Sequence, residues 1–366
     1  MSEEALAAVM IKPNEDFELK YFKIPEPEPN AIIAEITAAT VCGTDVHIWR
    51  GRRSVPLPII MGHEGVGRVH SIGCNVKTDS LGLNLTDGDK ILWSIVLTCG
   101  RCYGCIIEKD QVTCKNRKIY GYMSCQEFPH LNGTFSTHIY LRPNTVIFKV
   151  PDNIPDELLS TLNCAGAVAY HSFEKADMQL GMTAVIQGSG PISLYLTSLL
   201  KEIGVKVIVI GGNPIRLEAL RAFGADYIID RMKYKTPEER ITQVKELTDG
   251  IGADRVFELT GHPSVIPEGI SMLRRGGKYI LVGTASENIK TIEINPSMIT
   301  LNAIHLIGVR AYEPKHLLRI LKHFYEKKRK YPFDKIITQK FELKDVKKAI
   351  LMYEAGKLIK AAIIPK

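Results

Sequence analysis

The chain has 366 residues, which is enough for about two domains with separate hydrophobic cores. Hydrophobic residues make up 45% of it and charged residues 24%, which is the balance of a globular protein. The lysines and arginines behind the net charge of +7 are spread along the chain and form no basic stripe. We therefore expect no nucleic-acid partner.

The sequence gives no sign of a membrane or secretory protein. No apolar run reaches the roughly 18–20 residues that span a bilayer. The first residues are acidic, whereas a secretory signal begins with basic residues. Six of the eight cysteines stand in metal-ligand contexts, which favours a reducing compartment. We therefore expect a cytoplasmic protein with no membrane partner.

Residues 1–164 are predicted to form a β-rich domain. Short apolar stretches, such as residues 31–40 and 87–93, alternate there with glycine-containing turns. No long helical period interrupts this alternation. Two segments between these stretches, residues 42–47 and 62–64, carry metal-ligating side chains.

Four cysteines lie close together within residues 95–118, which we expect to form a separate lobe. Cys99, Cys102 and Cys105 have C-x2-C-x2-C spacing, and Cys114 follows after eight residues. Thiolates two residues apart on a glycine-containing turn can converge on one ion, and four of them form a closed tetrahedral shell. The spacing therefore predicts a structural zinc site. Because such a site has no open coordination position, the chemistry must lie elsewhere on the chain.

Residues 165–308 are predicted to form a doubly wound parallel sheet, so the fold class is α/β. Strand-like apolar stretches alternate there with helical patterns, as in dinucleotide-binding domains. The predicted strands are residues 183–187, 205–210, 226–230, 254–260 and 277–283. Residues 309–366 return to mixed structure, end in a strand at 361–365, and are assigned to the first domain.

A glycine turn follows the first of these strands. In order, it consists of Gly188, Ser189, Gly190, Pro191, Ile192 and Ser193. Glycines in such a turn let the backbone approach a pyrophosphate at a helix N-terminus. The third fingerprint position is Ser193 rather than glycine, but a strand precedes the turn and a helix follows it. We interpret the turn as the binding site of a nicotinamide cofactor.

The end of the second strand bears on the choice between NAD and NADP. An NAD site usually has a carboxylate there, which holds the ribose 2′-hydroxyl. This chain has Gly211, Gly212 and Asn213 instead, and Arg216 stands further on. The missing acid removes a repulsion against a 2′-phosphate, so the pattern leaves both coenzymes open with a tilt toward NADP.

A catalytic zinc needs about three protein ligands and one open position. The candidates are Cys42, His63 and Cys164. Glu64 stands beside His63. Each residue alone has a structural explanation, since free cysteines are commonly buried as small hydrophobes. Their combination on one chain with a nucleotide fold favours a metal centre.

Taken in order, these motifs resemble the zinc-dependent medium-chain alcohol dehydrogenases over essentially the whole chain. The shared motifs are Cys-Gly-Thr-Asp-x-His, Gly-His-Glu, the four-cysteine lobe, the nucleotide turn and Gly-x-Gly-Ala-Asp-x-Val-x-Asp-x-Thr-Gly. They match residues 42–47, 62–64, 99–114, 188–193 and 250–261. Glu258 stands where the last motif has its second aspartate. The resemblance implies a GroES-like catalytic domain and a Rossmann-type cofactor domain.

The resemblance also implies the metal ligands. Cys42, His63 and Cys164 would hold a catalytic zinc. Glu64 would be a neighbouring or exchangeable ligand. Together with the lobe, this gives two zinc ions per chain, one catalytic and one structural.

The same resemblance implies a proton path and the reaction. Thr44 would hydrogen-bond the substrate hydroxyl, and His47 would pass its proton toward solvent. Lys360 falls where the family often places a basic residue near the pyrophosphate. The expected activity is hydride transfer between an alcohol or polyol, or the matching ketone or aldehyde, and NAD or NADP.

Two alternatives remain beside this expectation. One is a dehydrogenase of a specialised sugar, cyclitol or biosynthetic intermediate. The other is a non-catalytic nucleotide-binding protein, which the intact set of ligand and relay residues disfavours. The family forms dimers and tetramers, so we expect a homo-oligomer, with residues 277–283 and the following segment as a candidate interface.

Overall fold

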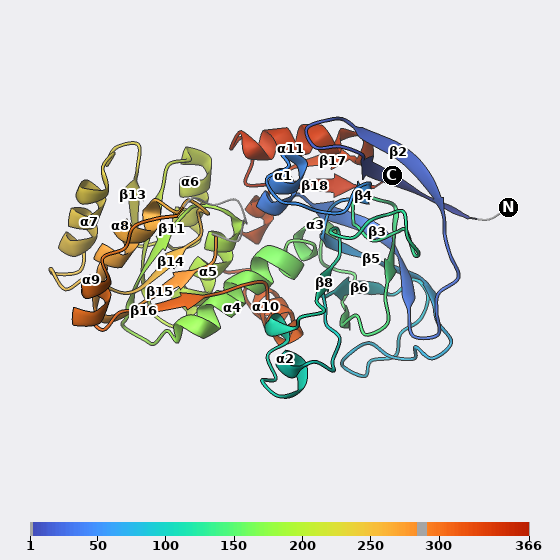
Figure 1. Cartoon of the computed structure of the whole chain (residues 1–366), viewed down its shortest axis with the longest axis horizontal. Coiled ribbons are helices and arrows are strands. Elements are labelled where there is room, and N and C mark those ends of the chain that lie inside the picture. Colours follow the sequence, from blue (N-terminus) through green and yellow to red (C-terminus); the bar gives the residue numbers. More distant parts are fainter. Residues whose placement is uncertain (1–2, 284–290, 366) are drawn as a thin grey trace. The chain divides into compact units, whose positions relative to one another are not determined.

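The chain folds into two units, which the computed structural model describes over residues 3–283 and 291–365 (Figure 1). The first unit consists of Met1–Cys164, Tyr312–Leu321 and Ile336–Lys366. The second consists of Ala165–Ala311 and Lys322–Lys335. Among the helices of the described residues, none is both long and apolar enough to cross a membrane.

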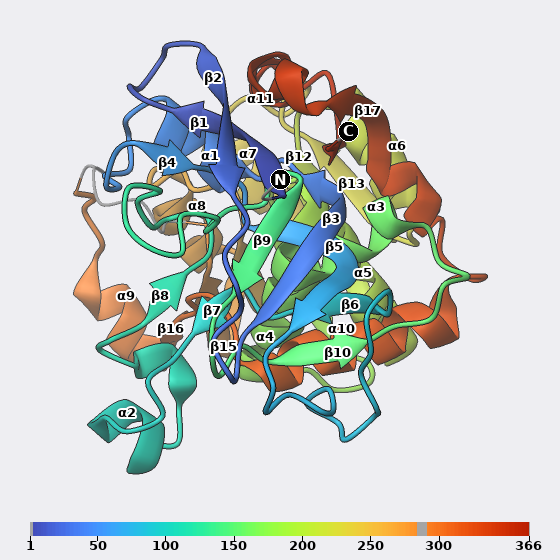
Figure 2. The ribbon, with the colours of Figure 1, turned by 90° about the vertical axis from the view of Figure 1, so that its right-hand side faces the viewer.

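A seven-stranded sheet forms the main body of the first unit. Its strands lie in the order β10 (Ile147–Lys149), β6 (Lys90–Trp93), β5 (Glu64–Ile72), β3 (Ile32–Thr40), β18 (Lys360–Ile364) and β17 (Ile337–Glu342), and β9 (His138–Leu141) also pairs with β3. Figure 2 looks onto β9, β3, β5 and β6. Nearly all of β3 is buried, which explains its apolar sequence. Thr40 at its end pairs with Glu64 of β5 and with Ala362 of β18, so three strands bring polar groups together there.

Smaller elements complete the first unit. A three-stranded sheet has the order β2 (Phe17–Lys23), β1 (Glu4–Met10), β4 (Ile59–Ile60). The helices of the first unit include α1 (Gly43–Trp49), α3 (Asp156–Leu159) and α11 (Val346–Glu354). Helix α1 contacts α11. The cysteine lobe contains β7 (Val96–Leu97), α2 (Tyr103–Ile106) and β8 (Lys118–Ile119). The core of the unit is built around large buried side chains such as Trp49, Trp93 and Phe135.

The second unit is a six-stranded parallel sheet. The order is β13 (Tyr227–Asp230), β12 (Lys206–Gly211), β11 (Thr183–Gln187), β14 (Ala253–Glu258), β15 (Leu273–Leu281), β16 (His305–Gly308). The chain order reverses beside β11, which is the switch point where such sheets bind dinucleotides. The predicted doubly wound sheet is confirmed.

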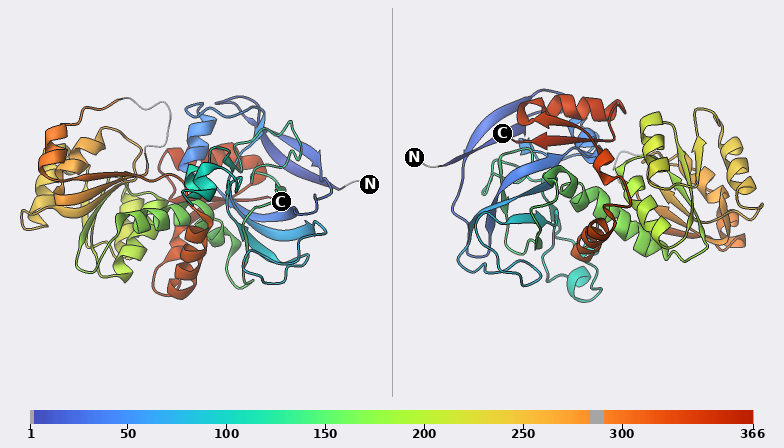
Figure 3. Two further views of the ribbon diagram at one scale, coloured as in Figure 1. Left: turned by 60° about the horizontal axis from the view of Figure 1, so that its bottom comes forward. Right: turned by 180° about the vertical axis from the view of Figure 1, so that it is seen from behind.

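Helices cover both faces of this sheet (Figure 3). On one face, α4 (Ala167–Ala176), α5 (Pro191–Glu202) and α6 (Pro214–Ala222) form a contiguous layer. Another group contains α7 (Pro237–Glu246) and α8 (Val265–Ser271), which contact each other and share a buried cluster with the strands. A further helix, α9 (Pro296–Leu301), precedes β16.

The C-terminal segment corrects the predicted domain assignment. Helix α10 (Pro314–Lys327) is divided between the units, and Lys322–Lys335 belongs to the second one. The reason is aromatic packing: the Phe333 ring lies 5.5 Å from that of Tyr195 and 5.4 Å from that of Phe223. The sequence analysis assigned everything after residue 308 to the first domain, which is wrong for this stretch.

Candidate active site and metal centres

Four cysteine sulfurs meet in the lobe of the first unit. The sulfurs of Cys99, Cys102, Cys105 and Cys114 all lie within 4.8 Å of one another. Cys102 and Cys105 are 3.6 Å apart, as are Cys99 and Cys114. A tetrahedral zinc with bonds of about 2.3 Å puts its sulfurs about 3.8 Å apart, whereas a disulfide needs about 2 Å. The cluster therefore fits one zinc ion and no disulfide.

The surroundings of this cluster shift the pKa values of its thiols in opposite directions. A backbone hydrogen bond from Arg101 and the Asn116 amide lower the pKa of Cys99 to about 6. Burial raises the pKa of Cys105 to about 11. A bound zinc ion would offset the cost of deprotonating Cys105, because a thiol that coordinates zinc is present as the thiolate. Gly104 makes the tight packing possible, since a Cβ there would lie 2.2 Å from the Thr113 hydroxyl oxygen.

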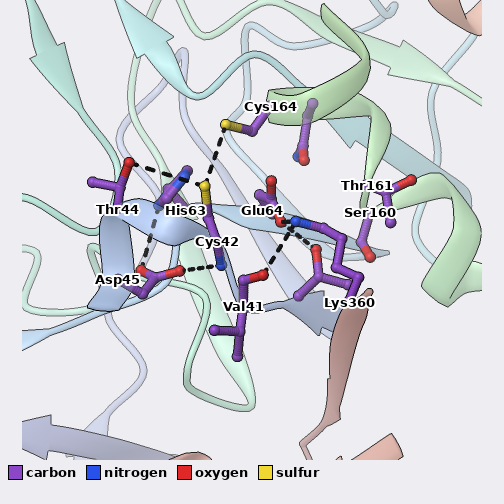
Figure 4. A network of polar contacts seen from close by, with 12 residues as sticks. Val41, Cys42, Thr44, Asp45, His63, Glu64, Ser160, Thr161, Cys164 and Lys360 are labelled. Carbon is purple, nitrogen blue, oxygen red and sulfur yellow. Dashed lines mark hydrogen bonds and ion pairs between the residues drawn. The ribbon is translucent and has the colours of Figure 1, made fainter. Parts of the chain in front are cut away.

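A second group of metal-ligating side chains lies elsewhere in the first unit. Cys42 precedes α1, His63 and Glu64 stand at the start of β5, and Cys164 ends the first stretch of the unit. One ligand atom from each residue lies within 4.8 Å of the others. The two sulfurs are 4.0 Å apart, and Figure 4 shows the four side chains grouped together. Two cysteines and one histidine are a ligand set of catalytic zinc, so the residues fit the metal.

Asp45 positions two of these ligands, and the sequence analysis gave it no role. Its Oδ2 accepts a hydrogen bond from the Cys42 backbone N–H at 2.7 Å, and its Oδ1 lies 3.5 Å from His63 Nδ1. A carboxylate on one ring nitrogen orients a histidine and leaves the other nitrogen for a metal. The sequence did hold a signal: Asp45 is the third residue after Cys42, where an acid completes a helix capping box.

Cys164 is held by the turn that contains it. The turn, Leu162–Gly166, is π-helical, a geometry frequent at functional sites. The buried Asn163 side chain donates a hydrogen bond to the Gly65 carbonyl oxygen at 2.7 Å. Because Gly65 directly follows Glu64, this bond ties the turn of Cys164 to the ligands at the start of β5.

Glu64 has two partners deep in the first unit. Its Oε2 forms an ion pair with Lys360 and accepts a hydrogen bond from the Thr40 hydroxyl. Lys360 also donates to the Val41 carbonyl oxygen at 3.2 Å (Figure 4). Burial lowers the pKa of Lys360, but the Glu64 carboxylate more than offsets this and raises that pKa above its usual value. The other oxygen, Oε1, has no hydrogen-bond partner among the described residues, so it is the one that can approach a metal.

In the second unit, β11 leads through the glycine turn into α5. Gly188 has φ = +121°, and a Cβ there would lie 3.1 Å from the Leu259 backbone, so the turn needs glycine. A Cβ at Gly190 would meet open space, which leaves room for a phosphate at the helix N-terminus. Ser193 donates a hydrogen bond to the Gly188 carbonyl oxygen at 3.0 Å. The turn therefore accommodates a buried serine at the third fingerprint position, and its shape fits a dinucleotide.

Comparison with known proteins identifies the family. Residues 28–152 match the alcohol dehydrogenase GroES-like domain, and residues 191–325 match the zinc-binding dehydrogenase domain. The 5-exo-hydroxycamphor dehydrogenase of Pseudomonas putida is 31% identical over 98% of each chain. An L-threonine 3-dehydrogenase of Pyrococcus horikoshii is 30% identical over 100% of each chain. A solved alcohol dehydrogenase from Thermotoga maritima is 36% identical over 100% of each chain, with a TM-score of 0.94. The chain belongs to the zinc-dependent medium-chain alcohol dehydrogenases.

As a zinc-dependent medium-chain alcohol dehydrogenase, the protein is an NAD(P)-dependent oxidoreductase that acts on small-molecule alcohols. The expectations of a GroES-like domain, a Rossmann-type domain, zinc and a nicotinamide cofactor are confirmed. The role of each residue, the number of zinc ions and the choice of coenzyme stay predictions.

The two residues predicted to relay the proton, Thr44 and His47, both lie on α1. The Thr44 hydroxyl oxygen is 3.9 Å from the Cys42 sulfur. His47 follows one turn later, on the same side of the helix. Burial lowers the pKa of His47, and the positive charges of Arg52 and Arg53 lower it further. Its Nδ1 is buried without a hydrogen-bond partner among the described residues.

Lys360 differs from its predicted surroundings. The sequence analysis placed it near a pyrophosphate, and the partner that the structure gives it is Glu64. Its pyrophosphate role stays a prediction.

At the end of β12 the structure adds a residue that the sequence analysis missed. Asn213 caps α6 by accepting a hydrogen bond from the Arg216 backbone N–H at 3.1 Å. Arg231 lies across the neighbouring turn: its backbone N–H donates to the Gly211 carbonyl oxygen at 2.8 Å. A Cβ at Gly212 would lie 2.6 Å from the Arg231 Nε. Arg231 follows β13 rather than β12, so only the sheet brings it to this turn.

Proposed function

We propose that the protein is a zinc-dependent dehydrogenase of a secondary alcohol or polyol, which passes hydride to NADP and in reverse reduces the ketone or aldehyde. Cys42, His63 and Cys164 hold the catalytic zinc. The convergence of these ligand atoms within 4.8 Å, with Glu64 in the same group, carries the proposal. A zinc ion held there supplies Lewis-acid polarisation of a substrate oxygen.

The residues of α1 handle the proton. The position of the Thr44 hydroxyl beside the Cys42 sulfur supports a hydrogen bond to an alcohol that binds at the same point. Thr44 accepts the alcohol's proton and donates its own toward His47. The lowered pKa of His47 keeps its imidazole neutral near pH 7, so it can accept that proton and release it to solvent.

The two clusters together support two zinc ions per chain. The lobe sulfurs have the separations of a closed zinc–thiolate shell, and such a shell stabilises the fold without taking part in the reaction. None of the eight cysteines is paired in a disulfide, which supports a reducing compartment, the cytoplasm.

NADP is the coenzyme that the second unit favours. No carboxylate stands at Gly211 and Gly212, where an NAD site would hold the ribose. The Arg231 guanidinium lies across this turn instead, and among the described residues no carboxylate forms an ion pair with it. An arginine there would offer paired donors to a 2′-phosphate.

The relatives support a secondary alcohol as the substrate. The names of both curated relatives, 5-exo-hydroxycamphor dehydrogenase and L-threonine 3-dehydrogenase, specify a hydroxyl on a secondary carbon. We extend this substrate class to the present chain.

A homo-oligomer is supported by an exposed strand edge. Strand β15 lies between β14 and β16, so the part of the predicted interface that it contains is interior to the sheet, and residues 284–290 of the following segment lie outside the described residues. In the described part of the chain, β16 is the outer strand on that side, and its Leu306 is 40% exposed. Leu301 of α9 is 79% exposed. Such an edge can pair with a second copy of the chain.

Zinc analysis of Cys42→Ala tests the proposal, together with assays of secondary alcohols and polyols using NAD and NADP. We expect the variant to lose one zinc per chain and more than about a thousandfold in kcat/KM, because several kcal/mol of charge stabilisation disappear. Wild-type protein should favour NADP. Cys125→Ala is the matched control, because Cys125 is buried outside both clusters. Full activity in Cys42→Ala would contradict the proposed site.

A further inference from the structure

Two polar side chains beside the metal site, Arg53 and Tyr122, have no direct role in the proposed reaction, in which Arg53 acts only through the effect of its charge on His47. The Arg53 guanidinium carbon lies 4.7 Å from the centre of the Tyr122 ring. The edge of that ring packs on the imidazole of His63, with the ring centres 5.7 Å apart at 80°. A cation is therefore held one side chain away from a metal ligand.

The charge of Arg53 is uncompensated, unlike that of its neighbours. Arg50 donates to the Glu354 carboxylate at 2.6 Å, and Arg52 reaches the same carboxylate at 3.5 Å. Among the described residues, no carboxylate forms an ion pair with Arg53. Its side chain is half-buried, and its backbone N–H donates to the His47 carbonyl oxygen at 3.2 Å, which fixes it next to the relay helix.

Tyr122 is the second of these side chains. The ring is half-buried, and its hydroxyl makes no hydrogen bond within the described residues. The ring itself packs edge-on against His63, so Tyr122 stands directly beside a metal ligand. A molecule whose hydroxyl binds at the metal site would therefore extend past Tyr122 toward Arg53.

We infer that Arg53 and Tyr122 bind an anionic group of the substrate, which is an alcohol that also carries a carboxylate or a phosphate. A guanidinium binds either anion through two parallel hydrogen bonds, and the tyrosine hydroxyl supplies a third donor. Stacking on the Tyr122 ring limits the conformations of the Arg53 side chain before the substrate arrives. The inference rests on the proposed function, since it takes the second cluster to be the place where the alcohol binds.

Matched pairs of alcohols test this inference. One pair is 3-hydroxybutyrate and its neutral analogue 3-hydroxybutyramide, and the other is glycerol 3-phosphate and 3-methoxy-1,2-propanediol. Calorimetric titration without coenzyme, where no reaction occurs, measures binding, and kcat/KM is measured separately with NADP. We expect the anionic member of one pair to bind at least about tenfold more tightly, as for a charge-assisted hydrogen bond. The pair that shows the preference identifies the anion as carboxylate or phosphate.

Three variants locate the cause of the preference. Arg53→Gln should abolish it while leaving binding of the neutral member unchanged, and Tyr122→Phe should reduce it by about threefold. Arg52→Gln is the control, because it removes the same charge from the next position, where Glu354 already compensates it. Zinc content and thermal unfolding confirm that each variant is folded.

The outcomes separate this inference from the proposed function. Equal binding within both pairs, or a preference that survives Arg53→Gln, overturns the inference, even if neutral alcohols are oxidised as proposed. A preference that depends on Arg53 in a zinc-loaded protein that oxidises neither kind of alcohol supports the inference and overturns the proposed function.

Discussion

The two metal-ligand clusters are assembled in different ways. The lobe cysteines all lie within residues 99–114, on short turns, and large lobe side chains such as Tyr103 and Ile107 are exposed. The second cluster joins Cys42 to Cys164, which are 122 positions apart, and its His63 and Glu64 are buried. A cluster of the first kind depends on local turns, and one of the second kind depends on the strands of the unit.

The two clusters also differ in the groups that surround them. Charged groups flank the second cluster, where Asp45 faces His63 and Lys360 pairs with Glu64. In the lobe, backbone and amide donors stabilise the thiolate forms of Cys99 and Cys102 instead. We therefore expect damage to the lobe to stay local, whereas damage near the second cluster should spread to the stability of the first unit.

Breaking the lobe should give the largest effect on metal content. Cys102→Ser leaves an incomplete thiolate shell, and structural zinc sites bind with about 10–16 kcal/mol, so the lobe should lose its ion. Elemental analysis should show one zinc fewer per chain, and trypsin should cut within residues 95–118. The reaction should keep its rate within about twofold.

Cys74→Ser, which changes an exposed cysteine outside both clusters, is the control and should keep both ions. Loss of both zinc ions from Cys102→Ser would show that the two clusters are coupled.

Breaking the ion pair behind the second cluster should cost the most stability. Lys360→Met leaves the Glu64 carboxylate buried without its cation, which should destabilise the first unit by about 3–5 kcal/mol in urea unfolding. Adding Glu64→Gln should restore most of that loss, because the charge is then removed as well.

Lys340→Met is the matched control, on the neighbouring strand β17. Lys340 pairs with Glu157, but its side chain is 57% exposed, so the cost should stay below about 1 kcal/mol. Equal losses in Lys360→Met and Lys340→Met would show that burial of the pair does not matter.

The contrast between local and long-range assembly also explains what the sequence could predict. The lobe spacing and the parallel sheet are patterns of neighbouring residues. The parallel sheet is confirmed, and the four lobe sulfurs converge as the spacing requires, while the zinc ion there stays a prediction. The second cluster was recognised only as a set of candidates strengthened by a family resemblance. Spacing says nothing about whether Cys42 and Cys164 meet.

Asp45 has a local signal, its capping-box position after Cys42. The other residues that the sequence analysis missed or misplaced depend on contacts between distant segments. Arg231 reaches the β12 turn only through strand pairing, and the packing of Phe333 decides which unit holds residues 322–335. Lys360 meets Glu64 because β18 and β5 both flank β3. No local periodicity encodes these contacts, so the sequence alone could not supply them.

Weakening the positioning of a ligand should have a smaller effect than removing a ligand. Asp45→Asn keeps the size of the side chain but removes the charge that faces His63, which should weaken zinc binding at the second cluster by about 10–100-fold. Competition with a chelator should show this loss for one of two ions. Asp110→Asn, which changes a helix-capping side chain in the lobe, should leave the second cluster's affinity unchanged. Equal weakening by both variants would contradict a specific role for Asp45.

An ion-pair group at the surface of the second unit should give the smallest effect, and one that depends on pH. Partial burial raises the pKa of Glu202, but hydrogen bonds from Lys327, Lys330 and Tyr331 outweigh it and lower that pKa to about 2. A carboxyl group whose pKa is lower in the folded chain stabilises the fold above its unfolded pKa, near 4.5, and the stabilisation fades as the pH falls toward 2. Glu202→Gln should therefore lose about 1 kcal/mol at pH 7, a small value because the Lys330 side chain is 60% exposed. Unfolding of both proteins in matched buffers should show the difference shrinking between pH 4.5 and pH 3. A difference that stays constant over that range would mean that the charge of Glu202 contributes nothing, and that the partly exposed cluster is stabilised by packing alone.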